Sequence, residues 1–382
     1  PVGVQLSALQ QDALVIFFSR PTKLALERAE AFQFRRMVVT RLAGQEAYRF
    51  FFVPNRRLES DDGPIEDRFG NQREETLKFG LFDTRIEPSL GIGMINNPTD
   101  WFQNEEIKLK QVAALEEADF VKQLRRQVQA SPLRALLINV NGFRERFSSA
   151  LRKTAFLGHV LDIDAPVMVF DWPGDQGSTL RGYRRAKAIA SESGGELART
   201  LELIIRQVQP DRLWLVANSM GGQVVVHAFS TLYRQADLAD AQTEIENVVL
   251  TAPDVDKAEF NDQFKREILA LAGNLTVYVS SNDRALLMSR FINRSRRLGE
   301  STLNPNNPDQ LEAAAAIFGL VEPDNTAITV VDVTPVNRTR NFHNFSLETP
   351  EFFDDLFLRL ANVDMPLSRP EYPVKTAEGK VY

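Results

Sequence analysis

The chain of 382 residues contains no cysteine. A disulfide framework, a thiolate zinc site and a cysteine nucleophile are therefore all excluded. Histidine is scarce as well, with three residues in the whole chain, and no histidine or acidic cluster has the spacing of metal ligands. We expect no metal site and no cofactor.

Long hydrophobic runs are absent too. The longest early run, "ALVIFF" at 13–18, is too short to span a membrane and lacks the basic flank and cleavage signal of a secretory leader. We expect no integral membrane segment and a cytoplasmic protein. Because the chain begins at Pro1, export by means of a removed leader stays open as an alternative.

A charge excess of one sign is missing as well, since 45 basic and 51 acidic residues are mixed along the chain. Such mixing gives no electrostatic footprint for nucleic acid or for an anionic membrane, so no nucleic-acid partner is expected. The short basic run "INRSRR" at 292–297 is typical of a solvated loop. The fragment "GIGM" at 91–94 lacks the third glycine and the strand-helix context of a nucleotide fingerprint.

The pattern of the chain changes near residue 46. Residues 1–45 contain apolar positions at helical spacing, as in "KLALERAEAFQFRRMV", which predicts an N-terminal helical extension before a main domain at 46–382. The main domain opens with "YRFFFVPNRR" and "KFGLFDTRIEP", which we interpret as two strands joined by a long polar excursion.

After Ser131, short apolar runs alternate with amphipathic helical patterns. The predicted strands are "ALLINV", "PVMVFDW", "RLWLVA", "IENVVLTA", "LTVYVSS" and "AITVVDV". This alternation predicts an α/β fold with a mostly parallel sheet and helices on both faces, which binds ligands at the carboxyl ends of its strands. The long connection at about 284–324 contains a helix-prone stretch, and we expect it to form a helical lid.

One junction between a predicted strand and a helix carries a serine, in "ANSMGG". Ala217 and Gly221 stand two residues before and two after Ser219, as a sharp nucleophile-bearing turn requires. Many ordinary turns match this pattern, so the serine needs a base to support a catalytic role. His159 and His227 fall within predicted helices away from the strand ends, which leaves His343, in a polar loop after the last strand.

A carboxylate should orient the imidazole of such a pair. Asp283 follows the strand "LTVYVSS" and directly precedes the strand that leads to His343, so it is the favoured acid. Asp254 follows the preceding strand and is the alternative acid, with Asp256 in the same loop. Either aspartate could instead be a plain helix N-cap.

Two backbone N–H groups should stabilise negative charge that develops near the serine. One is expected from Met220, directly after Ser219, and the other from Phe143, in the turn after the first parallel strand. Gly142 in that turn allows close approach, although an Asn-Gly pair also marks simple loops. The residues expected to line the pocket are Asn141, Gly142, Asn218 and Trp172, and packing in the core is the other interpretation of the tryptophan.

Taken together, these residues resemble the α/β-hydrolase superfamily over roughly Tyr48 to Val363. More narrowly, the chain resembles a bacterial family known as domain of unknown function 900. The stretches that carry this likeness are "FFVPNRR", "FGNQREETLKFG", "NVNGFRERFSSALRKTAFLGHVL", "VFDWPGDQG", "GYRRAKAIASESGGELARTL", "NSMGG", "LTAPDVDKAEF" and "SNDRALLMSRFINRSRRLG". The resemblance implies a serine hydrolase with Ser219, Asp283 and His343 as its triad, and it implies no natural substrate.

The chain departs from this family at two positions beside the expected site. Asn141 and Asn218 stand where such proteins commonly carry histidine, which keeps hydrogen-bonding capacity but removes a titratable group. We expect a serine esterase or lipase-like enzyme that acts on a small acyl or ester substrate through an acyl-enzyme. The alternatives are an inactive binding or scaffold protein with this fold, and an acyltransferase or amidase that uses the same triad.

Overall fold

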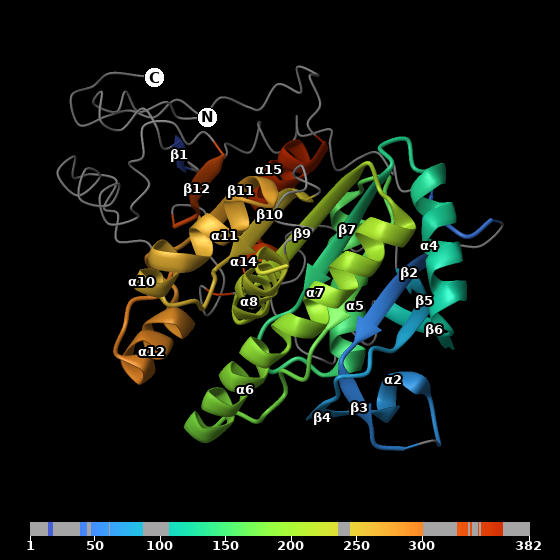
Figure 1. Ribbon diagram of the computed structural model, residues 1–382, viewed down its shortest axis with the longest axis horizontal. Coiled ribbons are helices and arrows are strands. Elements are labelled where there is room, and N and C mark those ends of the chain that lie inside the picture. Colours follow the sequence, from blue (N-terminus) through green and yellow to red (C-terminus); the bar gives the residue numbers. More distant parts are fainter. Residues whose placement is uncertain are drawn as a thin grey trace.

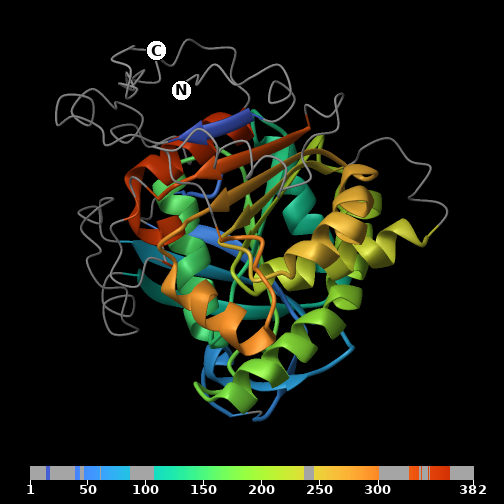
Figure 2. The ribbon, with the colours of Figure 1, turned by 90° about the vertical axis from the view of Figure 1, so that its left-hand side faces the viewer.

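The computed structural model describes residues 14–17, 39–43, 47–60, 62–86, 107–235, 245–300, 327–334, 337, 343 and 345–361. These residues form a sheet of 10 strands covered by helices on both faces, together with a separate ribbon of two strands (Figures 1 and 2). The predicted α/β class is confirmed.

The large sheet is parallel over most of its width. The spatial order of its strands is β1 (Leu14–Phe17), β12 (Ile328–Asp332), β11 (Ala272–Val279), β10 (Ile245–Thr251), β9 (Arg212–Asn218), β7 (Ala135–Val140), β8 (Val167–Asp171), β2 (Tyr48–Pro54), β5 (Phe79–Ile86) and β6 (Ile107–Leu115). In this order each strand from β1 to β2 pairs in parallel with its neighbour, whereas β5 is antiparallel to both β2 and β6.

Helices cover the two faces because the parallel strands are apolar on both sides. All six residues of β7 are buried, and in β9 the side chains of Leu213 and Leu215 enter one core cluster while those of Trp214 and Val216 enter the other. The first face carries α4 (Glu117–Ala130), α6 (Leu180–Glu192), α7 (Gly194–Leu203), α8 (Gly221–Tyr233) and α11 (Lys265–Leu269), and the second carries α5 (Phe147–Leu161), α14 (Phe345–Glu348) and α15 (Pro350–Ala361).

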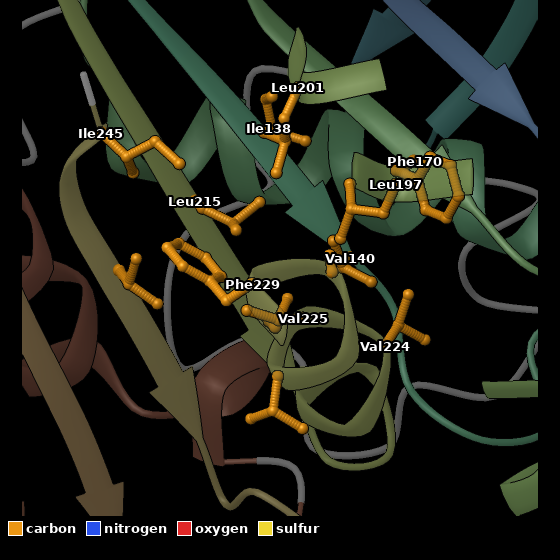
Figure 3. Close-up of a cluster of buried hydrophobic side chains, with 14 of the residues drawn as sticks. Ile138, Val140, Phe170, Leu197, Leu201, Leu215, Val224, Val225, Phe229 and Ile245 are labelled. Carbon is orange, nitrogen blue, oxygen red and sulfur yellow. The ribbon is translucent and has the colours of Figure 1, made fainter. Parts of the chain in front are cut away.

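The centre of the first core cluster lies between the sheet and helices α7 and α8 (Figure 3). Ile138 and Leu215 of the sheet, and Val225 and Phe229 of α8, are all 0% exposed. Burial of each such side chain stabilises the fold by roughly 1.5 to 3 kcal/mol. Helix α8 therefore has a fixed position on the sheet, and its amino end has a fixed position at the end of β9.

Shorter elements complete the described chain. Two short π-helical turns are present: η3 (Ile204–Val208) continues α7, and η4 (Phe260–Phe264) precedes α11. The ribbon is made of β3 (Arg56–Leu58) and β4 (Phe69–Arg73), and the remaining short helices are α2 (Ile65–Arg68), α10 (Lys257–Glu259) and α12 (Arg284–Asn293). Within the described residues, no helix is long and apolar enough to cross a membrane.

The predicted N-terminal helical extension is wrong at one place. Leu14–Phe17 form the strand β1, which pairs in parallel with β12 from Leu14 opposite Thr329 to Phe17 opposite Asp332. Four consecutive apolar residues rich in β-branched and aromatic types favour a strand once a sheet edge is present to pair with. Apart from 39–43, the rest of 1–45 lies outside the described residues, as do residues 301–324 of the predicted lid.

Candidate functional site

Five segments that follow strands meet at one edge of the sheet. Parallel strands end at the same edge, so the loops after β7, β9, β10, β11 and β12 converge there. The cavity at this edge has a volume of about 790 Å³. Its walls include residues from all five of these segments, namely Gly142, Ser219, Asp254, Ala285 and His343.

The turn that carries Ser219 is sharp and strained. Ser219 lies between the end of β9 and the start of α8, and its φ of 53° is in the left-handed region, which costs a residue other than glycine about 1 to 3 kcal/mol. A methyl group added at Gly221 would lie 2.6 Å from the carbonyl oxygens of Val140 and Asn141. The small residue that the sequence pattern places here is therefore required by the close approach of α8 to β7.

Ser219, His343 and Asp283 form a continuous chain of hydrogen bonds. The Oγ atom of Ser219 lies 2.8 Å from Nε2 of His343, and Nδ1 of the same ring lies 2.7 Å from Oδ2 of Asp283. All three side chains are largely removed from solvent, since Ser219 is 7% and Asp283 1% exposed and the His343 side chain is 13% exposed. In this arrangement Nδ1–H donates to the carboxylate, and Nε2 is left to accept the hydroxyl proton of the serine.

Asp283 holds two positions at once. Its Oδ2 atom accepts from His343, and its Oδ1 atom accepts from the backbone N–H groups of Ala285 and Leu286 at 2.9 and 3.0 Å. The sequence posed the N-cap and the acid as alternatives, but the structure combines them. Capping of α12 fixes the carboxylate, and so it also fixes the imidazole.

The electrostatics of the site favour a protonated imidazole. Burial lowers the pKa of His343, but the negative charge of Asp283 and its hydrogen bond outweigh burial, so the pKa is raised above its ordinary value. His227 behaves in the opposite way, because burial within α8 lowers its pKa, and its ring contacts Gln223 rather than Ser219. His159 is buried in the last turn of α5.

Asp254, the alternative acid, lies in the same cavity but has other partners. Its Oδ2 atom accepts from the hydroxyl of Tyr183 at 2.8 Å and its Oδ1 atom accepts from Ser289 at 2.5 Å, with Nε of Arg297 3.5 Å away. The negative charge of Asp254 raises the pKa of the Tyr183 phenol further, beyond the effect of burial. Asp256, in the same loop, is the N-cap of α10.

The two expected N–H donors flank the serine. Met220 follows Ser219 directly as the N-cap of α8, and Phe143 follows Gly142 in the loop after β7. A methyl group added at Gly142 would lie 3.0 Å from Cβ of Ser219, so this loop passes against the turn. Among hydrogen bonds between described residues, neither N–H donates to a backbone carbonyl.

The expected pocket residues divide into two groups. Asn141, Gly142 and Asn218 line the cavity. Trp172 does not, because its side chain is 1% exposed and packs in the core, and its indole N–H donates to the carbonyl oxygen of Asn141 at 2.7 Å. The expectation that Trp172 lines the cleft is therefore wrong, and the residue instead supports the loop that leads to Phe143.

A buried arginine that sequence reasoning missed supports the same loop. The side chain of Arg56 is 1% exposed and forms an ion pair with Asp171, at the end of β8. Its Nη2 atom donates to the carbonyl oxygens of Glu145 and Trp172 at 2.6 and 2.7 Å. Burial raises the pKa of Asp171, although the charge of Arg56 opposes that shift. The only signal in the sequence was an arginine two residues after the end of an apolar strand.

The two asparagines beside the serine, Asn218 and Asn141, are both hydrogen-bonded. Nδ2 of Asn218 donates to Thr251 Oγ1 at 3.0 Å and to Ser346 Oγ at 2.8 Å. Oδ1 of Asn141 accepts from Nδ2 of Asn139 at 3.3 Å. The contacts of Asn218 tie the ends of β9 and β10 to one another and to α14, whereas the contact of Asn141 stays at the end of β7. Within the part of the chain that the structure describes, no cluster of histidine and acidic residues could hold a metal ion.

Comparison with known proteins gives a family match over residues 116–357, to the family described as "Alpha/beta hydrolase of unknown function (DUF900)". No curated protein matches the chain. Solved structures with some likeness include three that differ in source. The first is esterase B from Lactobacillus rhamnosis, with 14% identity, 60% of this chain and 77% of that chain covered, and a TM-score of 0.31.

The other two are an esterase from Pyrobaculum calidifontis and MenH from S. aureus. The Pyrobaculum esterase is 12% identical to this chain, and the match covers 65% of this chain and 93% of the esterase, with a TM-score of 0.32. MenH is 12% identical to this chain, and the match covers 60% of this chain and 95% of MenH, with a TM-score of 0.30. At TM-scores this low, the likenesses say nothing about what this chain acts on.

We predict that Gly221→Ala destabilises the protein by about 1 to 3 kcal/mol, because the added methyl group would overlap the carbonyl oxygens at the end of β7. Gly195→Ala on α7 is the matched control, since a methyl group there meets no atom within 4 Å. The control should raise stability by up to about 1 kcal/mol. Urea unfolding of both variants measures the difference, and equal stabilities would contradict the account of the turn.

Proposed function

We propose a serine-hydrolase function for this chain, which belongs to the family of alpha/beta hydrolases of unknown function (DUF900). The substrate would be a carboxylic ester or a related small acyl compound, cleaved by way of an acyl-enzyme. The observation that carries the proposal is the pair of hydrogen bonds, 2.8 and 2.7 Å long, that connects Ser219 to His343 and His343 to Asp283 at the wall of a cavity.

In the first step Ser219 Oγ would attack the acyl carbon while Nε2 of His343 accepts the hydroxyl proton. A serine hydroxyl is a poor nucleophile at neutral pH, so this transfer is what makes the attack possible. The imidazolium that forms carries its second proton on Nδ1, which donates to Asp283. The carboxylate keeps the ring in the productive tautomer and stabilises its positive charge.

The negative charge of the tetrahedral intermediate falls on the former carbonyl oxygen of the substrate. The N–H groups of Met220 and Phe143 would donate to it, and each such donor contributes roughly a hundredfold to a thousandfold in turnover. Met220 directly follows Ser219 as the N-cap of α8, so its N–H would be the donor on one side of the hydroxyl. The hydrogen bonds from Arg56 and Trp172 would keep Phe143 in place on the other side.

The intermediate would collapse when His343 returns its proton to the leaving alcohol, which breaks the ester bond and leaves an acyl group on Ser219. A water molecule would then lose a proton to His343 and attack the acyl carbon. The second tetrahedral intermediate releases the carboxylic acid as the proton returns to Ser219 Oγ. The enzyme is restored without any redox change.

The decisive experiment is intact-mass labelling with a fluorophosphonate. The wild-type chain should gain one adduct, and Ser219→Ala and His343→Ala should each abolish it, because the first removes the nucleophile and the second removes the base. His227→Ala is the matched control, since that ring lies within α8 and contacts Gln223; it should lower stability and keep the labelling. A folded wild type that gains no adduct would favour an inactive binding protein instead.

The rate of labelling should depend on pH through His343. Because its pKa is raised above the ordinary value of 6.5, the ring is protonated and unable to accept a proton over a wider acidic range. The rate should therefore fall as pH decreases through a midpoint above 6.5. In Asp283→Asn the charge that raises this pKa is gone, so the midpoint should move to lower pH. If the midpoint stays at the same pH in Asp283→Asn, Asp283 does not raise the pKa of His343, and this account of the site is wrong.

The two aspartates of the site should differ in their effect on turnover. Asp283→Asn removes the negative charge and leaves one acceptor oxygen where two are used, so it should reduce ester hydrolysis on the order of a thousandfold or more. Asp254→Asn leaves the chain from Ser219 to Asp283 intact and should cost less than about tenfold, in line with the loss of one charged hydrogen-bond acceptor. Initial rates with a nitrophenyl ester measure both. A larger loss in Asp254→Asn would assign the acid to the loop after β10.

A further inference from the structure

Helices α6 and α12 lie side by side at the mouth of the cavity (Figure 2). Nδ2 of Asn293 donates to the hydroxyl of Tyr183 at 2.9 Å, and Nζ of Lys187 donates to Oδ1 of Asn293 at 3.1 Å. The hydroxyl groups of Tyr183 and Ser289 are 2.7 Å apart. These contacts join the helices into one surface, which we call the α6–α12 rim and define as the solvent-facing residues of 180–191 and 284–297.

The α6–α12 rim is unusually apolar. Of the five large hydrophobic residues that are exposed in the described part of the chain, four lie on it: Leu180 at 47%, Leu287 at 46%, Met288 at 62% and Phe291 at 83%. Scattered exposed apolar residues are ordinary, but a group at one place marks an interaction site. Leu180, Met288 and Phe291 also line the cavity, so the apolar part of the rim continues into the pocket that holds Ser219.

The same surface is strongly basic. Residues 180–191 and 284–297 together contain nine arginines and lysines and no acidic residue, in a chain whose net charge is -6, and the acidic residue that ends α6, Glu192, forms an ion pair with Arg73. Two of the basic residues on these two segments form ion pairs with N···O distances of 3.5 Å: Arg290 pairs with Glu300, and Arg297, which is buried, pairs with Asp254. The three exposed arginines of α6 form no ion pair with another described residue: Arg181, Arg184 and Arg185.

We propose that the α6–α12 rim docks the protein on an anionic lipid bilayer. Basic side chains near such a surface each contribute about 1 kcal/mol of attraction, and exposed leucine, methionine and phenylalanine side chains enter the boundary between headgroups and acyl chains. A nucleic acid would satisfy the arginines but not the exposed apolar side chains beside them, whereas a bilayer satisfies both. Charge complementarity together with the apolar residues therefore selects the bilayer.

Docking in this way would turn the mouth of the cavity towards the membrane. The apolar residues Leu180, Met288 and Phe291 would then form a continuous path from the bilayer to Ser219. This consequence rests on the proposed serine-hydrolase function: the substrate would be an ester whose acyl chain is dissolved in the bilayer. The docking surface itself does not depend on catalysis, so the two proposals can fail separately.

The test uses the full chain as Ser219→Ala, so that no lipid is cleaved, in a flotation assay with vesicles. Vesicles of phosphatidylcholine with phosphatidylglycerol should carry the protein to the top of the gradient, and vesicles of phosphatidylcholine alone should carry much less. High salt should weaken the binding, because it screens the attraction between arginines and headgroups. Absence of flotation with the anionic vesicles, or equal flotation with both kinds, would overturn the proposal.

Charge-reversal variants locate the surface. Arg181→Glu with Arg184→Glu should reduce binding tenfold or more, given about 1 kcal/mol for each basic residue lost. Lys122→Glu with Arg126→Glu, both exposed on α4, changes the net charge equally and should leave the binding nearly unchanged. Fluorophosphonate labelling of the Arg181→Glu, Arg184→Glu pair in a chain that retains Ser219 should be normal without vesicles. An equal loss in the α4 control would contradict the location.

The apolar part of the rim is tested by Met288→Ser with Phe291→Ser. This variant should lose flotation on anionic vesicles, while circular dichroism and the unfolding midpoint report that it is folded. Heparin serves as a soluble polyanion in a parallel binding measurement. If the variant floats like its parent and heparin binds both as tightly as vesicles do, the surface is a plain polyanion site and the bilayer proposal is wrong.

Discussion

The sharp turn at Ser219 is the constraint on which the rest of the site depends. A positive φ at a residue other than glycine is unfavourable, and it persists here because β9 before the turn and α8 after it are both anchored in the core. Gly221 lets α8 approach the carbonyl groups of Val140 and Asn141 within a distance that excludes any side chain. The side chain of Ser219 is thereby presented to the cavity.

The carboxylate of Asp283 connects this turn to a second helix. One of its oxygen atoms caps α12 and the other accepts from His343, so helix formation and orientation of the imidazole rely on one side chain. The arrangement resembles that of Arg56 and Trp172, which satisfy buried backbone carbonyls and at the same time hold the loop of Phe143. Groups that stabilise the fold thus also set the geometry of the site.

Asp254 and its partners add a further layer to the cavity. Tyr183 from α6 and Ser289 from α12 both donate to this carboxylate, which joins the two helices above the pocket. Their outward surfaces carry the exposed apolar and basic residues of the α6–α12 rim. A buried acidic group and its hydrogen bonds therefore connect the interior of the site to the surface that would meet a membrane.

Local sequence pattern determined much of this protein. The runs "ALLINV" and "RLWLVA" predicted β7 and β9 to within a residue, because strands buried on both faces must be apolar throughout. Elimination among three histidines left His343, and strand order favoured Asp283. The pattern did not lead us to predict β6 or α4, although Phe120, Val121, Leu124 and Val128 stand at helical spacing.

Only the tertiary structure decided the relations between distant segments. These relations are the pairing of β1 with β12, the burial of Trp172, the ion pair of Arg56 with Asp171, and the contact of α6 with α12. Helices α6 and α12 lie about a hundred residues apart in the chain, and their contact brings together basic residues that look evenly mixed in the sequence. Periodicity reports the environment of a residue along its own element, whereas such contacts depend on how elements pack, which no local pattern encodes.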